Sequence, residues 1–239
     1  MYRLACVFAH PDDETFSVGG MLAKLAEAGT RSALFCATDG DAGRSSGIPV
    51  ASRAELGAIR RAELAAAARI LGIASLSTPG HGDGLLRDVD PERLIGGIVL
   101  FLRTHRPQVV VTFGPEGAPN GHRDHRAISR AATAAFFLSG LATEFPEHLR
   151  EVSPHRAARL YYCAWDPETE PRLLSVPLTA RVDVASFRDR KRDAFLAHAS
   201  QREHQARFET VALKDSECFA LAAGEPQPRA VVEDLFEGL

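Results

Sequence analysis

The 239-residue sequence has no long hydrophobic run, no excess of basic charge and no closely spaced cysteine pair. Its 28 Lys and Arg residues are scattered among 31 Asp and Glu residues, so nothing in the charge pattern indicates nucleic-acid binding. No segment reaches the length of a membrane span, and only a short apolar run follows Arg3, so we expect neither a signal peptide nor a membrane helix. These absences favour a small-molecule or carbohydrate ligand.

The four cysteines lie far apart, and three of them fall within strand-like apolar runs. Without a C-x-x-C pair they indicate neither zinc binding nor redox chemistry, so we expect buried, reduced thiols and a cytoplasmic location. They are Cys6, Cys36, Cys163 and Cys218. The glycine-rich motifs that bind dinucleotide or nucleoside triphosphate phosphates are also missing after the first strand-like run.

Hydrophobic periodicity predicts alternating strands and helices over the first 138 residues. The predicted strands cover residues 4–9, 31–38, 75–78 and 109–113, and the predicted helices cover 19–29, 52–71, 91–105 and 126–138. Repeated strand-helix-strand units build parallel sheets, so the fold class is α/β with a mostly parallel central sheet. Beyond Gly140 the pattern loosens, with strands predicted at 160–164 and 179–184 and helices at 187–199 and 231–236. We expect one domain over residues 1–239, with an irregular C-terminal third.

Two clusters of ionisable residues each follow a predicted strand. Residues 10–14 (HPDDE) follow the first strand, and residues 114–125 follow the strand at 109–113. In open parallel sheets, ligands bind outside the carboxyl ends of the strands, so we expect the two clusters to share one crevice. Three adjacent carboxylates repel one another unless a cation or solvent relieves them. The alternative reading of residues 10–14 is a solvated acidic loop or the first turn of a helix.

The spacing of the histidines suits a metal site. Two residues separate His10 from Asp13, and two residues separate His122 from His125. Two imidazoles and one carboxylate with an open coordination position form a recurrent catalytic Zn²⁺ site, and the same ligands also suit non-haem Fe²⁺. If His10, Asp13 and His125 are the ligands, Asp12 and His122 are left for proton transfer.

Hydrolysis at such a metal gives each remaining residue a role. A bound metal lowers the pKa of water from about 15.7 to about 7. We predict Asp12 to be the general base, and His122 to stabilise the oxyanion and protonate the departing amine. Asp124 is predicted to orient His122, as carboxylates often do for imidazoles near metals. Glu14 is predicted to support the corner at Pro11 through hydrogen bonds or the start of the following helix.

These motifs together resemble a known family. Residues 9–14 (AHPDDE), Asp39-Gly40 and residues 121–125 (GHRDH) resemble the LmbE-like, or PIG-L, metal-dependent deacetylases, which remove an acetyl group from N-acetylglucosamine-type substrates. The resemblance continues through the following positions to about Gln201: Arg60, Glu63, Leu71-Gly72, Asp83, Lys191, His198 and Gln201. It implies a Rossmann-like three-layer fold and a zinc-dependent amidohydrolase acting on a linear amide of an N-acetylated amino sugar.

The resemblance also implies roles for single residues. It places Zn²⁺ on His10, Asp13 and His125, with Asp12 as the base and His122 as the acid or electrostatic partner. By the same likeness Arg60 and Asp83 would hold sugar hydroxyls, and His198 would have a role in substrate binding.

Three points about substrate recognition stay open in the sequence. The loop at residues 39–50 is predicted to be a flap that brings Arg44 within reach of a ligand. Either Arg60 or Arg61 could be the guanidinium that reaches the site. Arg123 stands where the commonest form of the later motif has proline, so the aglycone is undetermined.

Two alternative functions are a serine hydrolase and a non-catalytic binding module. Residues 43–47 match the G-x-S-x-G nucleophile elbow, but that motif needs a strand before Ser45 and a helix after it, and here loop sequence lies on both sides. A non-catalytic carbohydrate or nucleotide-sugar binding module would be favoured if Asp12 or a ligand were missing, and none is. We expect His105, His148, His155 and His204 to be solvent-exposed. A homo-oligomer is compatible with the sequence but not indicated by it.

Overall fold

The computed structural model of the protein describes residues 2–118, 120–166 and 176–239. Strands and helices alternate through its first part: β1 (Tyr2–Phe8), α1 (Asp13–Glu27), β2 (Arg31–Cys36), α2 (Arg53–Leu71), β3 (Ser75–Ser77), α3 (Pro91–His105), β4 (Val109–Thr112) and α4 (Arg123–Leu138). The remaining elements are β5 (Arg159–Ala164), β6 (Ala180–Asp183), α5 (Arg188–Leu196), α6 (Gln205–Arg207) and β7 (Ser216–Gly224). Short 3₁₀ turns at Leu86–Asp88, Pro146–Arg150, Ala185–Phe187 and Ala199–His204 and a π-helical turn at Phe208–Ala212 complete the described elements.

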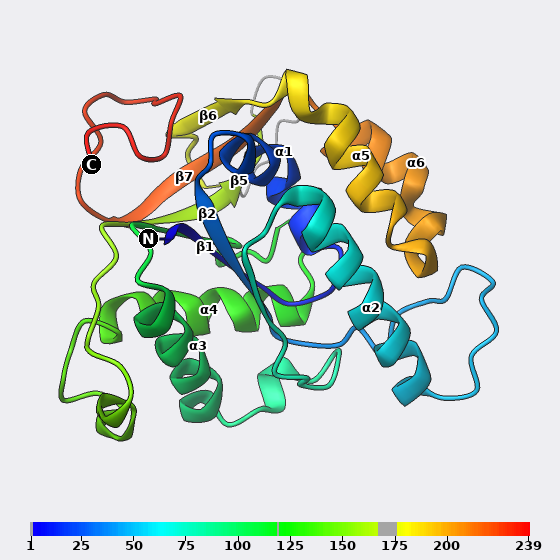
Figure 1. The fold of residues 1–239 in the computed structure, drawn as a ribbon, viewed down its shortest axis with the longest axis horizontal. Helices are drawn as coiled ribbons and strands as arrows, with labels where there is room; N and C mark the ends of the chain where they lie inside the picture. The colour runs from blue at the N-terminus through cyan, green and yellow to red at the C-terminus, as the bar shows by residue number, and fades with distance from the viewer. Residues whose placement is uncertain (1, 119, 167–175) are drawn as a thin grey trace.

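The strands form one sheet in the order β3-β2-β1-β4-β5-β7-β6. The first five strands in this order are parallel, whereas β7 runs antiparallel to both β5 and β6. Helices α1, α2 and α5 lie on one face of the sheet, and α3 and α4 lie on the other (Figure 1). The predicted α/β class, the three layers and the mostly parallel sheet are therefore confirmed.

The strand order places a binding crevice next to β1. The chain leaves β1 toward β2 and β3 on one side and returns to β4 on the other, so the order reverses between β1 and β4. Ligands of open α/β sheets bind at this reversal, beyond the carboxyl ends of the strands. Both ionisable clusters follow these two strands: residues 10–14 come after β1, and residues 114–125 come after β4.

Local sequence signals fix the helix ends as predicted. The Ser52 side chain accepts a hydrogen bond from the Glu55 N–H and caps α2, and Gly72 ends that helix at a φ of 74°. Helix α3 begins at Pro91 behind the Asp90 cap and ends at His105. The predictions for both helices are confirmed, as is the short strand β3.

Helix α1 begins at Asp13 and ends at Glu27, so the helix predicted at residues 19–29 starts six residues earlier than expected. Three elements of the C-terminal third also differ from the prediction. Strand β7 was not predicted, because its sequence SECFALAAG is rich in alanine and has no β-branched residue. It forms because β5 and β6 pair with its two edges. Residues 231–236 form turns instead of the predicted helix, with Val232 bridged to Ala180. The helix predicted at 187–199 ends earlier, at Leu196.

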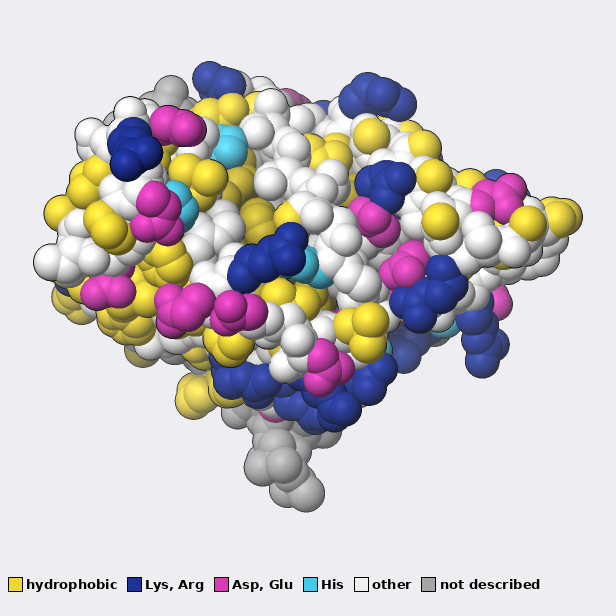
Figure 2. Space-filling view, turned by 90° about the horizontal axis from the view of Figure 1, so that it is seen from below, with side chains coloured by type: hydrophobic (Ala, Val, Ile, Leu, Met, Phe, Trp, Pro, Cys, Tyr) yellow, Lys and Arg dark blue, Asp and Glu magenta, His cyan; other side chains and the backbone are white. Residues whose placement is uncertain are grey.

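The cysteines agree with the sequence, but three histidines do not. His105, His148 and His155 were predicted to be solvent-exposed and are half-buried, and the His105 and His155 rings contact the Phe101 and Pro107 carbonyl oxygens. All four cysteines are free thiols, and Cys6, Cys36 and Cys163 are buried. No helix in the described ranges combines the length and apolar character needed to cross a membrane. Acidic and basic side chains are mixed on the face seen from below, with Lys and Arg gathered along its lower edge (Figure 2).

A buried ion pair joins the C-terminal third to α1. The Lys191 Nζ lies 2.7 Å from Glu217 Oε1, and the two side chains are 1% and 4% exposed. The same Glu217 carboxylate accepts hydrogen bonds from the backbone N–H groups of Gly20 and Met21, at 2.8 and 2.9 Å. Because α1 begins at the end of β1 and carries part of the acidic cluster, this pair fixes the position of the helix under the crevice.

We expect Lys191→Met to destabilise the protein by about 3–5 kcal/mol, since it leaves the Glu217 carboxylate buried without its cation. Urea unfolding followed by circular dichroism measures the change. Lys214→Met is the matched control: Lys214 is exposed, so its loss should change the free energy of unfolding by less than about 0.5 kcal/mol. Equal stability of the two variants would contradict this account of the ion pair.

Candidate active site

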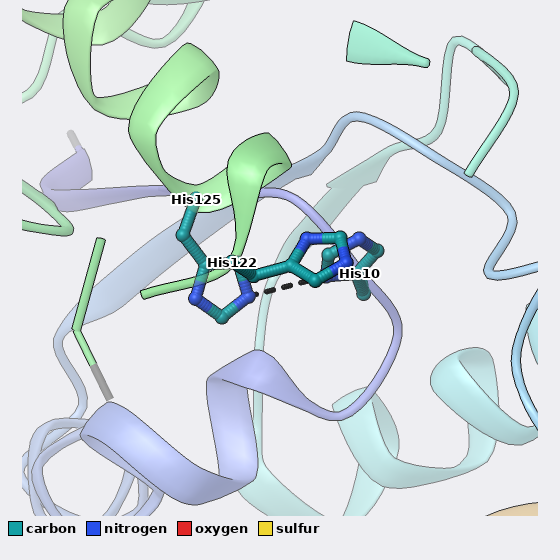
Figure 3. Close-up of side chains that lie close together, drawn as sticks. All are labelled: His10, His122 and His125. Carbon is teal, nitrogen blue, oxygen red and sulfur yellow. Dashed lines mark hydrogen bonds between the residues drawn. The ribbon is translucent and has the colours of Figure 1, made fainter. Parts of the chain in front are cut away.

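The crevice at the strand reversal is an open cleft of about 720 Å³. Its lining residues come from the end of β1, the start of α1, helix α2, the loop after β3, the start of α4 with the loop before it, and the segment after α5. They are His10, Asp12, Asp13, Phe16, Arg60, Asp83, Asn120, His122, His125, Gln201, His204 and Arg207. Three imidazoles point toward one another in it, His10 from the β1 side and His122 and His125 from α4 (Figure 3). The two ionisable clusters therefore meet, as predicted.

The side chains of His10, Asp13 and His125 converge, and Asp13 contacts the two imidazoles through its two carboxylate oxygens. His10 Nδ1 lies 3.2 Å from His125 Nε2, the contact drawn as a dashed line in Figure 3. Asp13 Oδ1 lies 3.2 Å from His125 Nε2, and Asp13 Oδ2 lies 3.5 Å from His10 Nδ1. In a tetrahedral zinc site with bonds of about 2.0–2.1 Å, neighbouring ligand atoms are about 3.3 Å apart. The three side chains are already spaced for such an ion.

The surroundings of the two imidazoles leave these donor atoms free to bind a cation. His125 Nδ1 lies 3.0 Å from the Ala118 carbonyl oxygen, so a proton on Nδ1 leaves the Nε2 lone pair for a metal. The other nitrogen of His10, Nε2, lies 3.1 Å from Asp83 Oδ1 and 3.3 Å from Asp124 Oδ2. A carboxylate behind each ligating histidine is typical of metal centres, and His10 has two.

Two other groups of side chains could also hold an ion. One consists of His10, His122 and His125, and the other of His10, Asp83 and Asp124. The second group would require His10 Nε2 to lose its hydrogen bonds to the same two carboxylates. Asp13 is well placed to be the third ligand in place of His122. Its oxygens lie within 3.5 Å of His10 Nδ1 and His125 Nε2, and its side chain is nearly buried.

The protonation equilibria of the site show how much negative charge is gathered there. Burial alone would lower the pKa of His10, but hydrogen bonds to Asp124, Asp13 and Asp83 raise this pKa well above its usual value. Burial would raise the pKa of Asp13, but the neighbouring His125 and His10 hold this pKa well below its usual range. In the absence of a metal, protonated imidazole provides the positive charge that these buried carboxylates need.

Asp12 has a strained backbone. Its φ of 113° lies in the left-handed region, which costs a residue other than glycine about 1–3 kcal/mol. Three neighbours hold it: Glu14 Oε2 accepts the Asp12 N–H at 3.0 Å, Thr15 Oγ1 donates to the Asp12 carbonyl at 2.7 Å, and Arg60 donates to the Pro11 carbonyl. Asp12 and Asp13 both line the cleft. The prediction that Glu14 supports this corner is confirmed.

Burial raises the pKa of Asp12 to about 6, even though the Arg60 guanidinium opposes the shift. Arg60 Nη2 lies 3.4 Å from Asp12 Oδ2, and the Arg60 side chain is only 4% exposed. A carboxylate in this range can accept a proton near neutral pH better than an ordinary aspartate.

His122 is the N-cap of α4. Its Nδ1 accepts a hydrogen bond from the Asp124 N–H at 3.2 Å, so the proton of the neutral ring sits on Nε2. Burial and the charges of His10 and His125 lower the pKa of His122. The predicted orientation of this ring by the Asp124 carboxylate is wrong. In the first turn of α4 that carboxylate points into the protein, where it contacts His10 and accepts from the Gly84 and Leu86 N–H groups.

Arg60, not Arg61, reaches the cleft. Arg60 is 3% exposed and donates to the Gly40 carbonyl at 2.9 Å as well as to Pro11. A Cβ atom at Gly40 would lie 2.4 Å from its guanidinium, so the glycine lets the arginine pass. Arg61 instead pairs with Asp39 at the surface. Asp83 also lines the cleft, as predicted, but its Oδ1 contacts His10, so part of its function is to hold that ring.

Two predicted substrate-binding residues do not reach the cleft. The Arg44 side chain is 81% exposed and lies 3.3 Å from Glu203, because its loop packs against the segment after α5 through backbone atoms. His198 is fully buried, with Nε2 2.7 Å from Glu14 Oε1. The predicted contact of His198 with substrate is therefore wrong. Its partner Glu14 accepts the Asp12 N–H through the other carboxylate oxygen. Arg123 lies against Gly84, outside the cleft.

Several residues that line the cleft were not predicted from the sequence. His204 was expected to be solvent-exposed, yet it lines the cleft together with Arg207, Gln201, Asn120 and Phe16. The spacing of His204 and Arg207 by three residues would place them on one face of a helical turn. This spacing alone does not predict a role in the cleft, because the sequence does not show that residues 204–207 lie beside it.

Comparisons with known proteins identify the family. The model of the PIG-L family, described as GlcNAc-PI de-N-acetylase, matches residues 5–136. A relative from Rhodococcus opacus (strain B4), named 1D-myo-inositol 2-acetamido-2-deoxy-alpha-D-glucopyranoside deacetylase, is 31% identical, and the match covers 83% of this chain and 81% of the relative. A relative from Bacillus anthracis, named probable N-acetyl-alpha-D-glucosaminyl L-malate deacetylase 2, is 33% identical over 82% of this chain and 79% of its own.

Solved structures support the fold. N,N'-diacetylchitobiose deacetylase from Pyrococcus horikoshii superposes with a TM-score of 0.76 at 22% identity, covering 92% of this chain and 83% of that one. The 4-carboxy-2-hydroxymuconate hydratase of Pseudomonas putida KT2440 also gives 0.76, at 21% identity, covering 96% and 99%. Because a deacetylase and a hydratase share the fold, the reaction has to be argued from the site.

The family match spans more than half of the chain, and relatives above 30% identity extend over most of their own length. The chain therefore belongs to the PIG-L, or LmbE-like, family.

Proposed function

We propose that the protein is a metal-dependent amidohydrolase that removes the acetyl group from an N-acetylglucosamine-type sugar. The observation that carries this proposal is the convergence of His10, Asp13 and His125 at 3.2–3.5 Å, beside Asp12 and His122 in the same cleft. The names of the relatives support the substrate class, since they describe deacetylases of glucosaminyl inositol and glucosaminyl malate.

His10, Asp13 and His125 would hold the metal. Nitrogen and carboxylate ligands in this number suit Zn²⁺, and Fe²⁺ accepts the same set. When bound, the ion would supply Lewis acidity toward the acetyl carbonyl and the attacking water. Asp83 and Asp124 would keep His10 in place through its Nε2.

The residues around the metal would move the protons. Asp12 takes a proton from the attacking water as its oxygen bonds to the acetyl carbon. His122 donates a hydrogen bond from Nε2 to the carbonyl oxygen while negative charge builds there. When the C–N bond breaks, Asp12 delivers the proton that it took from water to the amine nitrogen, while neutral His122 keeps its Nε2 proton and its hydrogen bond to the oxygen. The overall reaction adds one water and yields acetate and the free amine.

Asp12 and Asp13 should respond differently to substitution. We expect Asp12→Asn to keep about one metal ion per chain but to lose a factor of about 10²–10⁴ in kcat, since general-base catalysis contributes that much. Asp13→Asn should lose both metal and activity. Metal analysis and amine release from N-acetylglucosaminides measure both properties. If Asp12→Asn loses its metal, Asp12 is a ligand and these roles are wrong.

The second prediction concerns pH. Asp12 must be deprotonated to act as a base, so kcat/KM should fall as the pH drops through the pKa of Asp12. Burial sets that pKa to about 6, and a cation bound at Asp13 would lower it, so the acidic limb should lie at or below about pH 6. A pH profile of kcat/KM measures this limb. An acidic limb above pH 7 would show that another group controls the reaction.

The third prediction concerns His198. Its Nε2 lies 2.7 Å from Glu14 Oε1, while Glu14 Oε2 holds the strained Asp12 N–H, so His198 positions the base through Glu14. We expect His198→Ala to lower kcat by about tenfold with little change in KM or metal content. His198→Gln, whose amide can still donate to Glu14, should recover most of the loss. A fall in both variants with loss of metal would indicate a general structural defect instead.

A further inference from the structure

One wall of the cleft has basic groups that the proposed reaction does not use. Gln201, His204 and Arg207 form this wall, on the segment that follows α5. His10, Asp12, Asp13 and His125 line the same cleft. When the acetamide lies at the metal site, the rest of the substrate therefore lies in a cleft that this wall also lines.

The other charged groups of the cleft already have partners. Arg60 donates to the Gly40 and Pro11 carbonyls and faces Asp12, so its guanidinium is engaged. The carboxylates of Asp13 and Asp83 contact His10 or His125 and also accept from backbone N–H groups. The Arg60 guanidinium and the carboxylates of Asp13 and Asp83 are therefore not free to select a substituent.

Arg207 differs from these groups. Among the described residues, no carboxylate lies within ion-pair distance of its guanidinium, although the side chain lines the cleft. His204 lies three residues earlier and also lines the cleft, and its Nε2 is 3.8 Å from Glu203, a loose contact on a side chain that is 43% exposed. An unpaired arginine at a protein surface is usually just hydrated. Arg207, however, lines the cleft that a substrate would occupy.

We propose that Arg207, assisted by His204, binds an acidic substituent on the sugar, so that the protein acts on anionic N-acetylglucosaminides in preference to neutral ones. This inference rests on the proposed function. A guanidinium binds a carboxylate or a phosphate through two parallel hydrogen bonds, and both groups share the chemistry that Arg207 offers. The net charge of the whole chain is −3, so the attraction has to come from local groups of this kind.

The relatives show why the distinction matters. One is named for a glucosaminyl inositol, whose aglycone is neutral, and the other for a glucosaminyl malate, whose aglycone carries carboxylates. At 31% and 33%, their identities to this chain do not separate the two substrate classes. Arg207, which has no carboxylate partner within the part of the chain that the structure describes, favours the anionic class.

The test compares three substrates on the metal-loaded full-length protein: N-acetylglucosaminyl malate, N-acetylglucosamine 1-phosphate and the neutral N-acetylglucosaminyl inositol. We expect at least one anionic substrate to have a kcat/KM at least tenfold above the neutral one, mainly through a lower KM. The carboxylate and phosphate arms show which acid the wall fits. In Arg207→Gln, the ratio of anionic to neutral kcat/KM should fall at least tenfold, since a charge-assisted hydrogen bond is lost.

Arg202→Gln is the matched control, because Arg202 is exposed on the same segment but does not line the cleft. It should leave the ratio unchanged. A wild-type protein that deacetylates the neutral substrate as well as both anionic ones would overturn the inference and leave the proposed function standing. An Arg207→Gln variant that lowers all three rates equally would also overturn it. If the metal-loaded wild type releases amine from none of the three, the proposed function itself fails.

Discussion

The contact of His10 with three buried carboxylates is the interaction on which the rest of the site depends. Asp13 faces its Nδ1, and Asp83 and Asp124 face its Nε2. Carboxylates are costly to bury unless positive charge compensates them, and here they come from three separate parts of the chain. The reversal of strand order between β1 and β4 brings these parts together. A metal on the Nδ1 side would supply positive charge in place of the imidazole proton and leave the Nε2 side hydrogen-bonded to Asp83 and Asp124.

The corner at Asp12 gives the same short motif a second function. The two adjacent aspartates have different partners: Asp12 Oδ2 lies 3.4 Å from Arg60 Nη2, whereas the Asp13 carboxylate contacts His10 and His125. The backbone between these two side chains is strained, since Asp12 has a positive φ. Such strain persists only where the surroundings fix it. Glu14, Arg60 and His198 do so from three elements, so the C-terminal segment contributes to the geometry of a residue almost two hundred positions away.

The sequence predicted most of the fold and the inner part of the site, for physical reasons. Strand-helix alternation and capping residues such as Ser52 are local signals, and the two ionisable clusters had to meet because both follow parallel strands. The predictions failed where tertiary contacts decide the outcome. Strand β7 depends on its neighbours, the burial of His198 depends on packing against α1, and the wall at Arg207 lies on a turn whose path no local pattern reveals.

A crystal structure of the zinc-loaded protein, with anomalous scattering recorded at the zinc edge, tests the central claim most directly. We predict one ion about 2.0–2.2 Å from His10 Nδ1, His125 Nε2 and an Asp13 oxygen, with the Asp12 carboxylate outside its coordination shell. An ion held by His10 Nε2, Asp83 and Asp124, or by the three histidines without Asp13, would contradict the assignment of the site.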